Sequence, residues 1–173
     1  MPVSTRRVVT GLDDDGRSAI ILDGTSPCQV SVPNMGVHAQ MLWTTTETPA
    51  DNSGNTDITE GPWPSNIAPP NGTTFYIFEY APGAGGTSTR EDGEKEPGSG
   101  MHATATIDYI VILSGEMTFI TESGETVLRA GDTVVDRGVA HAWENRGSEP
   151  VVMASITIDA KPLVEGQELL GSM

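Results

Sequence analysis

Cysteine is nearly absent from this sequence of 173 residues, in which Cys28 stands alone. An internal disulfide and a zinc site built from several cysteines are therefore excluded, and a reducing compartment is expected. Basic residues are also scarce, with 9 Lys and Arg against 24 Asp and Glu and a formal net charge of −15. Because this charge would repel phosphate backbones and anionic membranes, we expect no nucleic-acid partner and no membrane partner.

Long hydrophobic runs are missing as well. No segment approaches the roughly 20 apolar residues of a membrane span. The amino terminus is not followed by an apolar run of signal-peptide length. These absences predict a cytoplasmic protein.

Glycine and proline are plentiful, at 20 and 12 residues, and they separate short stretches rich in Val, Ile, Thr and aromatic residues. This pattern is typical of an all-β protein and suggests a sandwich or barrel. The length fits a single domain over 1–173, with a core over about 70–160 and N-terminal strands over 18–45 that pack on it. The predicted strands cover 19–22, 29–32, 38–44, 74–80, 106–113, 116–121, 125–129, 132–135, 140–145 and 151–158.

Two connections, 47–70 and 82–100, are long and crowded with Gly, Pro, Ser, Thr and charged residues. Connections of this length are usually functional lids or disordered segments, and the sequence leaves both roles open.

Strand alternation places the candidate site residues. Side chains two residues apart point to the same face of a strand. His102, Thr104 and Asp108 share a face if the extended conformation begins at residue 101. On a later strand His141 shares a face with Trp143 and Asn145. If both faces point into a barrel, two imidazoles and a carboxylate meet in its interior.

The residues 100–108, Gly-Met-His-Ala-Thr-Ala-Thr-Ile-Asp, precede Gly115 by six residues and resemble the first motif of the cupin superfamily. The residues 131–145 contain Gly-Asp, then Arg-Gly-Val-Ala-His and a final Asn, and they resemble the second motif. This resemblance implies a double-stranded β-helix, the antiparallel jelly-roll barrel of the family. It also implies a small single-domain member linked to aromatic or polyketide-like metabolism, and a homodimer formed through an exposed sheet.

The departures from these motifs bear on the metal site. Thr104 replaces the second histidine of the family, Asp108 replaces its glutamate, and Arg137 replaces the proline before the glycine of the second motif. The remaining set of His102, His141 and Asp108 could bind Fe(II), Mn(II), Zn(II) or Ni(II) and leave positions open for substrate. A metal-free site, with the histidines hydrogen-bonded in the core, is the alternative.

Other side chains are candidates for substrate contact. Trp143 offers a flat apolar surface or packs in the core, while Thr104 and Asn145 would line the same pocket. Glu79 is an acidic residue in an apolar strand, and it is an acid or base candidate if it points inward, although we favour an outward position. His38 is a candidate for a missing ligand by residue type alone.

The cupin resemblance does not choose a reaction, because one fold hosts many chemistries. We expect an enzyme with a small-molecule substrate, and the first hypothesis is a lyase, either a dehydratase or a decarboxylase, acting on an oxygenated aromatic or polyketide-like compound. The first alternative is an Fe(II)-dependent oxidoreductase or dioxygenase. The second is a non-catalytic barrel that binds a small molecule against Trp143.

Overall fold

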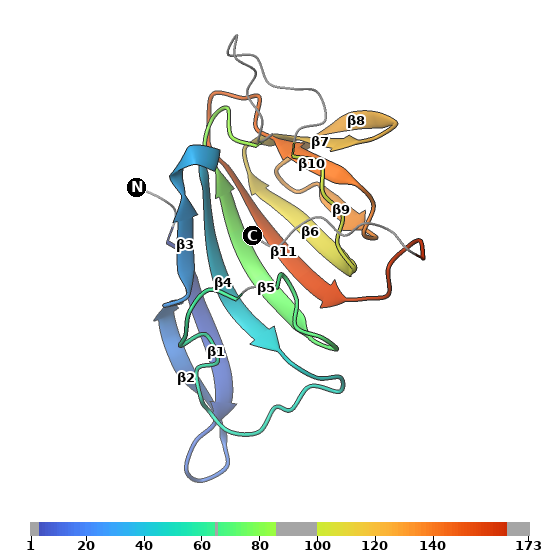
Figure 1. Cartoon of the computed structure of the whole chain (residues 1–173). Helices are drawn as coiled ribbons and strands as arrows, with labels where there is room; N and C mark the ends of the chain where they lie inside the picture. The colour runs from blue at the N-terminus through green and yellow to red at the C-terminus, as the bar shows by residue number, and fades with distance from the viewer. Residues whose placement is uncertain (1–3, 65, 86–99, 166–173) are drawn as a thin grey trace.

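The computed structural model describes residues 4–64, 66–85 and 100–165, and within them the regular structure is almost entirely β. The first seven elements, shown in Figure 1, are β1 (Arg6–Leu12), β2 (Ser18–Thr25), β3 (Gln29–Val32), the 3-10 turn η1 (Pro33–Met35), β4 (Val37–Thr45), β5 (Thr73–Tyr80) and β6 (Thr106–Ser114). The remaining five are β7 (Glu116–Thr121), β8 (Gly124–Arg129), β9 (Thr133–Asp136), β10 (His141–Glu144) and β11 (Val151–Asp159).

The strands form two facing sheets and one separate hairpin. The larger sheet has the order β3-β4-β5-β11-β6-β9, and the smaller one has the order β10-β7-β8 (Figure 1). β1 and β2 pair only with each other, below the larger sheet in the view. Every pairing is antiparallel, so the predicted all-β antiparallel architecture is confirmed.

Each of the ten predicted strands is present, with ends that shift by up to three residues. β1 was missed, because its outward side chains include apolar Val8 and Leu12 while its buried side chain is Arg7, the reverse of the usual pattern. The strands predicted over 18–45 have two places in the structure. β2 pairs with β1, whereas β3 and β4 are strands of the larger sheet itself.

The main core lies between the two sheets, where inward side chains of both meet. Met117, Leu128 and Trp143 come from the smaller sheet. The larger sheet contributes alternate residues of β4, β5, β6 and β11, which are Val37, Ala39, Met41, Tyr76, Phe78, Ile110, Ile112, Val151 and Met153.

A bulge in β4 changes which residues point inward. The register between β4 and β5 shifts between Met41 and Trp43, so Leu42 is an extra residue on its strand. Before the bulge the odd-numbered side chains face the core, and after it Thr44 lies opposite the inward Thr74. Leu42 belongs to a second buried cluster with Ile77 on the outer side of the sheet.

In the part of the chain that the structure describes, no helix is long and apolar enough to cross a membrane.

Candidate active site

The centre of the site is a buried pair of one carboxylate and one imidazole. Asp136 is the last residue of β9 and His141 the first of β10, and both are almost fully buried. The Nδ1 atom of His141 lies 2.7 Å from Oδ2 of Asp136 and 2.9 Å from the carbonyl oxygen of Val139. Because Nδ1 is engaged in this way, Nε2 is the atom that His141 can present to a ligand.

The short turn between Asp136 and His141 sets this geometry. Oδ1 of Asp136 accepts the backbone N–H groups of Gly138 at 3.0 Å and Val139 at 3.3 Å. An Asp side chain commonly closes a turn in this manner. Gly138 has φ of 75°, and a Cβ there would stand 2.4 Å from the carbonyl oxygen of Thr104. Only glycine therefore lets the turn pass this close to the segment that carries His102.

The environment favours the charged forms of this pair. Burial opposes a charge on His141, but the hydrogen bond and charge of Asp136 outweigh it and raise the imidazole pKa above 6.5. Burial likewise opposes ionisation of Asp136, but the contacts with His141 and the two turn N–H groups lower its pKa below 3.8. At neutral pH Asp136 is therefore an anion that favours the imidazolium form of His141.

His102 reaches the site through an isolated β-bridge rather than through a continuous strand. Its backbone exchanges two hydrogen bonds of 2.9 Å with that of His141, and the two ring centroids are 4.3 Å apart. Nδ1 of His102 lies 3.0 Å from the carbonyl oxygen of Gly100, which again leaves Nε2 for a ligand. Burial and the charge of His141 lower the pKa of His102 below 6.5, so this ring is neutral at pH 7.

β6 begins at Thr106, as the predicted strand does, so the extended conformation from residue 101 on which the shared face of His102 depended is not continuous. Thr104 and Asp108 are nevertheless buried, and the hydroxyl oxygens of Thr104 and Thr106 are 2.6 Å apart. The sequence placed these side chains on one face by alternation. The structure instead positions His102 by its bridge to His141.

Asp108 lies directly opposite Asp136 in the ladder between β6 and β9. Burial raises its pKa to about 6, and hydrogen bonds from Thr106 and Thr157 only partly oppose this shift. Its Oδ1 atom is buried without a hydrogen-bond partner among the described residues. A buried acceptor in this state has unused capacity for a ligand or a shared proton.

A row of hydroxyl groups continues from Asp108 across the larger sheet. Thr157 of β11 pairs with both Asp108 and Thr74, and Thr74 pairs in turn with Thr44. The hydroxyl oxygens of Thr44 and Thr74 are 3.2 Å apart. The barrel interior therefore has a polar layer suited to an oxygenated ligand beside its apolar core.

Aromatic rings line the interior from both sheets. The smaller sheet contributes Phe119 and Trp143, with ring centroids 4.6 Å apart and His141 beside them at 5.5 and 6.0 Å. On the larger sheet Tyr76 and Phe78 stack at 5.3 Å, and Trp63 lies 5.6 Å from Tyr76. The sequence predicted the place of Trp143, whereas Tyr76 and Trp63 were not identified as site residues.

Three other candidates do not join this group. Asn145 is fully buried, and its Nδ2 donates to the carbonyl oxygens of Tyr80, Ala81 and Glu149, so it ties strands together rather than lining the site. Glu79 pairs with His38 and Val152 on the face opposite to Tyr76 and Phe78, so it points away from the interior, as favoured from the sequence. His38 shares that outer face, with Nδ1 2.8 Å from the Ser31 hydroxyl.

Asp136 is the main functional residue that the sequence reasoning missed. The available signal was the turn pattern Asp136-Arg-Gly138, in which an aspartate accepts the N–H two residues later. The neighbouring Arg137, which replaces the proline of the family motif, has an exposed side chain.

The predicted metal set is present only in part. His102 and His141 both offer Nε2, which suits a divalent ion. Among residues 4–64, 66–85 and 100–165, however, no group of three or more His, Cys, Asp or Glu side chains is arranged to hold a metal. Asp108 thus does not complete a ligand set with the two histidines.

Comparisons with known proteins identify the family. A model of the cupin domain matches residues 76–158. The phomopsin biosynthesis cluster protein C' of Diaporthe leptostromiformis is 32% identical over 175 residues, which cover 96% of this chain and 85% of that protein. The cupin-domain-containing oxidoreductase virC of Hypocrea virens is 29% identical over 167 residues, 92% of this chain and 78% of that protein.

Among solved structures, a Cupin 2 conserved barrel domain protein from Salinispora arenicola CNS-205 matches 73% of this chain and 78% of its own, with 20% identity and a TM-score of 0.45. The family assignment comes from the sequence relatives and from the two motifs, which contribute His102 and His141 to one site. This chain belongs to the cupin superfamily.

Proposed function

We propose that this protein is an oxidoreductase that acts on a small oxygenated aromatic or polyketide-like molecule inside the barrel. The observation that carries the proposal is the pair of adjacent imidazoles, His102 and His141, which have opposite pKa shifts and stand beside aromatic rings. The names of several relatives support the reaction class, since virC, srdD and fogC are each named a cupin-domain-containing oxidoreductase.

The two imidazoles divide the proton chemistry between them. His102, whose pKa is lowered, is a neutral base that accepts a proton from a substrate hydroxyl group. His141, whose imidazolium form Asp136 favours, donates a hydrogen bond from Nε2 to the oxygen on which negative charge develops. A deprotonated oxygenated ring loses electrons more readily than its protonated form, and we propose dioxygen as the co-substrate that accepts them: a substrate that loses two hydrogens would reduce it to hydrogen peroxide.

The hydroxyl row and the aromatic rings support the substrate class. Thr106 and Thr157 surround Asp108 with groups that can donate to or accept from ligand oxygens. Phe119 and Trp143 offer flat apolar surfaces next to His141. A planar molecule that carries hydroxyl or carbonyl groups matches both features.

The same proton chemistry also serves a lyase, which requires no electron acceptor, and one experiment separates the two reactions. A panel of hydroxylated aromatic and 1,3-dicarbonyl compounds is incubated with the protein, while oxygen uptake is recorded and products are analysed by mass spectrometry. We expect oxygen uptake with products that lose two hydrogens or gain oxygen. Products that lose only water or carbon dioxide, without oxygen uptake, would replace the proposal by the lyase hypothesis.

His141→Gln is the variant that ties this activity to the site. It removes the cationic donor next to His102, and turnover should fall at least about 100-fold. Glu79→Gln is the matched control, because it removes a charge from the outer face of the larger sheet. Equal turnover by the wild type and the His141 variant would show that the reaction occurs elsewhere.

We also propose that two copies of the chain associate through the outer face of the larger sheet. Large apolar side chains are exposed at outward positions of β5, β6 and β9, namely Phe75, Tyr109, Leu113 and Val135. Exposed apolar groups on one sheet face favour a symmetric pair. Sedimentation analysis should give a dimer for the wild type and a monomer for Tyr109→Lys, whereas a monomeric wild type contradicts this proposal.

A further inference from the structure

The segment between β4 and β5 contributes side chains to the barrel interior. The structure describes it over 46–64 and 66–72. Trp63 and Ile67 pack against the main core, the ring of Trp63 lies 5.6 Å from that of Tyr76, and the Tyr76 hydroxyl donates to the Ile67 carbonyl oxygen at 2.9 Å. This segment is therefore packed on the barrel rather than extended into solvent.

The contact places Trp63 close to the polar layer of the active site. Tyr76 follows the inward Thr74 by two residues on β5, and Thr74 pairs with Thr157, which pairs with Asp108. The charge of Asp108 is one cause of the raised pKa of the Tyr76 hydroxyl, after burial. Trp63 thus contacts, at a tilt of 38°, a ring that is adjacent to the row of groups proposed to bind oxygens.

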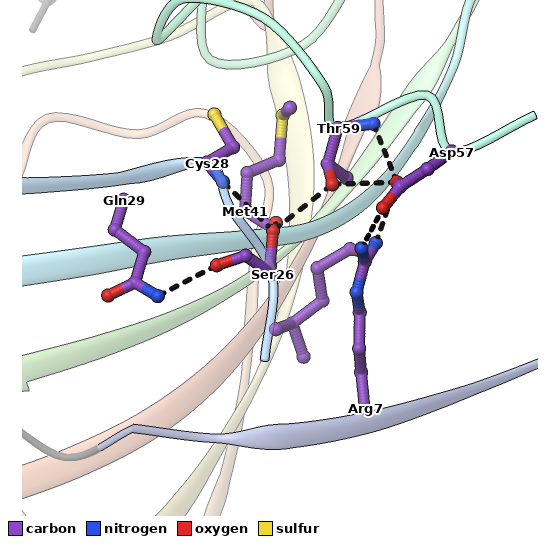
Figure 2. Close-up of polar contacts among 8 residues, drawn as sticks. Arg7, Ser26, Cys28, Gln29, Met41, Asp57 and Thr59 are labelled. Carbon is purple, nitrogen blue, oxygen red and sulfur yellow. Dashed lines mark hydrogen bonds and ion pairs between the residues drawn. The ribbon is translucent and has the colours of Figure 1, made fainter. Parts of the chain in front are cut away.

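A buried ion pair holds this segment in place (Figure 2). Arg7 of β1 is only 8% exposed, and its guanidinium binds both carboxylate oxygens of Asp57, one of them at 3.0 Å. Nη1 of Arg7 also donates to the carbonyl oxygen of Leu42 at 3.0 Å. That carbonyl belongs to the bulge residue of β4, so one side chain joins β1, β4 and the segment.

Hydroxyl groups extend the anchor toward the core. Oδ1 of Asp57 accepts both the N–H and the hydroxyl of Thr59, at 3.0 and 2.7 Å. The hydroxyl of Ser26 lies 3.2 Å from that of Thr59 and donates to the Met41 carbonyl oxygen at 2.6 Å (Figure 2). These contacts tie the segment to β1 and β4 through the guanidinium Nη atoms of Arg7, the Asp57 carboxylate and two hydroxyl groups, although Nε of Arg7 is buried without a partner among the described residues.

From this geometry we propose that Trp63 is a specificity-determining residue that contacts the flat part of the substrate, and that Arg7 is the positioning residue that holds its segment against the barrel. This inference rests on the proposed function, since it assigns a substrate contact of the same site. A planar hydroxylated ring would stack near Trp63 and Tyr76 while its oxygens face the hydroxyl row.

The test for Trp63 measures binding of 2-naphthol, a planar hydroxylated probe, by fluorescence titration and calorimetry. Trp63→Leu keeps an apolar side chain but removes the ring, and it should weaken binding about tenfold. Trp43→Leu is the matched control, because Trp43 lies opposite Phe75 on the outer side of the same sheet, and its affinity should equal that of the wild type. Equal affinities of both variants, or a wild type that does not bind the probe, overturn the inference.

The test for Arg7 uses Arg7→Lys, which keeps the positive charge but cannot reproduce the two parallel contacts to Asp57. Amide hydrogen exchange in 46–64 should accelerate and the 2-naphthol affinity should fall several-fold, while exchange in β10 stays unchanged. Exchange in 46–64 that matches the wild type overturns the positioning role. Arg6→Lys is the control, since the neighbouring Arg6 forms an exposed ion pair with Asp23.

These measurements separate the inference from the proposed function. Loss of probe affinity in Trp63→Leu supports the specificity role even if the compound panel shows a lyase product or no turnover. Conversely, oxygen-dependent turnover with unchanged probe affinity in that variant supports the oxidoreductase and removes Trp63 from its substrate contacts.

Discussion

Two buried ion pairs at separate places in this protein differ in what surrounds them. The Nη atoms of Arg7 and the carboxylate of Asp57 have partners within the chain, among them the Leu42 carbonyl oxygen and the Thr59 hydroxyl, while Nε of Arg7 is buried without a partner among the described residues. Asp136 and His141 are also buried and paired, but the imidazole has a second nitrogen beyond this contact. Both carboxylates have lowered pKa values, so charge alone does not distinguish the two pairs.

The surroundings explain the difference. Near His141 stand a second imidazole and the Asp108 carboxyl, whose Oδ1 has no partner among the described residues. Buried polar groups normally have hydrogen-bond partners, so an incomplete set marks a place where a ligand can supply the missing ones. The pair at Arg7 joins a chain segment to β1 and β4, whereas the pair at His141 lies where the proposed chemistry would take place.

The largest effect is expected where the cation cannot give up its proton. Arg7→Met leaves the Asp57 carboxylate buried without its counter-charge and should lower the free energy of unfolding by about 3–5 kcal/mol. Urea denaturation followed by circular dichroism measures this loss. Arg6→Met is the control and should unfold like the wild type, because the Arg6–Asp23 pair is exposed to solvent. Similar midpoints for both variants would contradict the assignment of the Arg7 pair as a structural anchor.

Asp136→Asn should have a smaller effect on stability, because His141 can become neutral when its partner is lost. We expect a loss of about 1–3 kcal/mol at pH 6. The raised pKa of His141 contributes stability that is present below 6.5 and is lost as pH rises through the folded-state pKa. The difference from the wild type should therefore shrink in alkaline buffer.

The same variant should reduce turnover far more than it reduces stability. An amide at position 136 no longer favours the imidazolium form of His141, so we expect a drop of about 100-fold or more. Titration by NMR should show the His141 pKa falling towards or below 6.5. An unchanged His141 titration would show that Asp136 does not control the charge of the ring.

The sequence predicted much of the fold because its strands obey local rules. Alternation and turn residues identified the strands of both sheets, and the two motifs identified His102 and His141. The prediction missed β1, whose buried residue is a cation, and Asp136, which acts through a turn rather than through strand alternation. Both depend on partners that only the folded chain brings together.

Long-range contacts account for the rest of what was missed. Trp63 enters the barrel from a connection that has no periodic pattern. Rules based on local sequence therefore do not predict its contact with Tyr76. The predicted connection 82–100 has its residues 86–99 outside the described part of the chain, so its role stays a prediction. Strand alternation predicted Asn145 as a substrate contact, yet its Nδ2 atom donates hydrogen bonds to backbone carbonyl oxygens.

An effect of opposite sign, and no larger than that of Asp136→Asn on stability, is expected at Asp108. Its pKa rises from 3.8 in the unfolded chain to about 6 in the folded protein, so the folded state keeps a proton that the unfolded state has released between these values. Stability contributed by this group therefore falls as pH rises from about 4 to 6 and stays low above that range. Asp108→Asn removes the ionisation and should stabilise the protein by roughly 1–3 kcal/mol at pH 8 but hardly at pH 4.

Thermal unfolding across this pH range measures the effect, with Asp14→Asn as a control on an exposed turn. The control should change stability little, because its side chain is exposed. If Asp108→Asn were destabilising at pH 8, the carboxylate would have to be satisfied by partners in its ionised form. Its Oδ1 would then not be the open acceptor that we assign to the proposed active site.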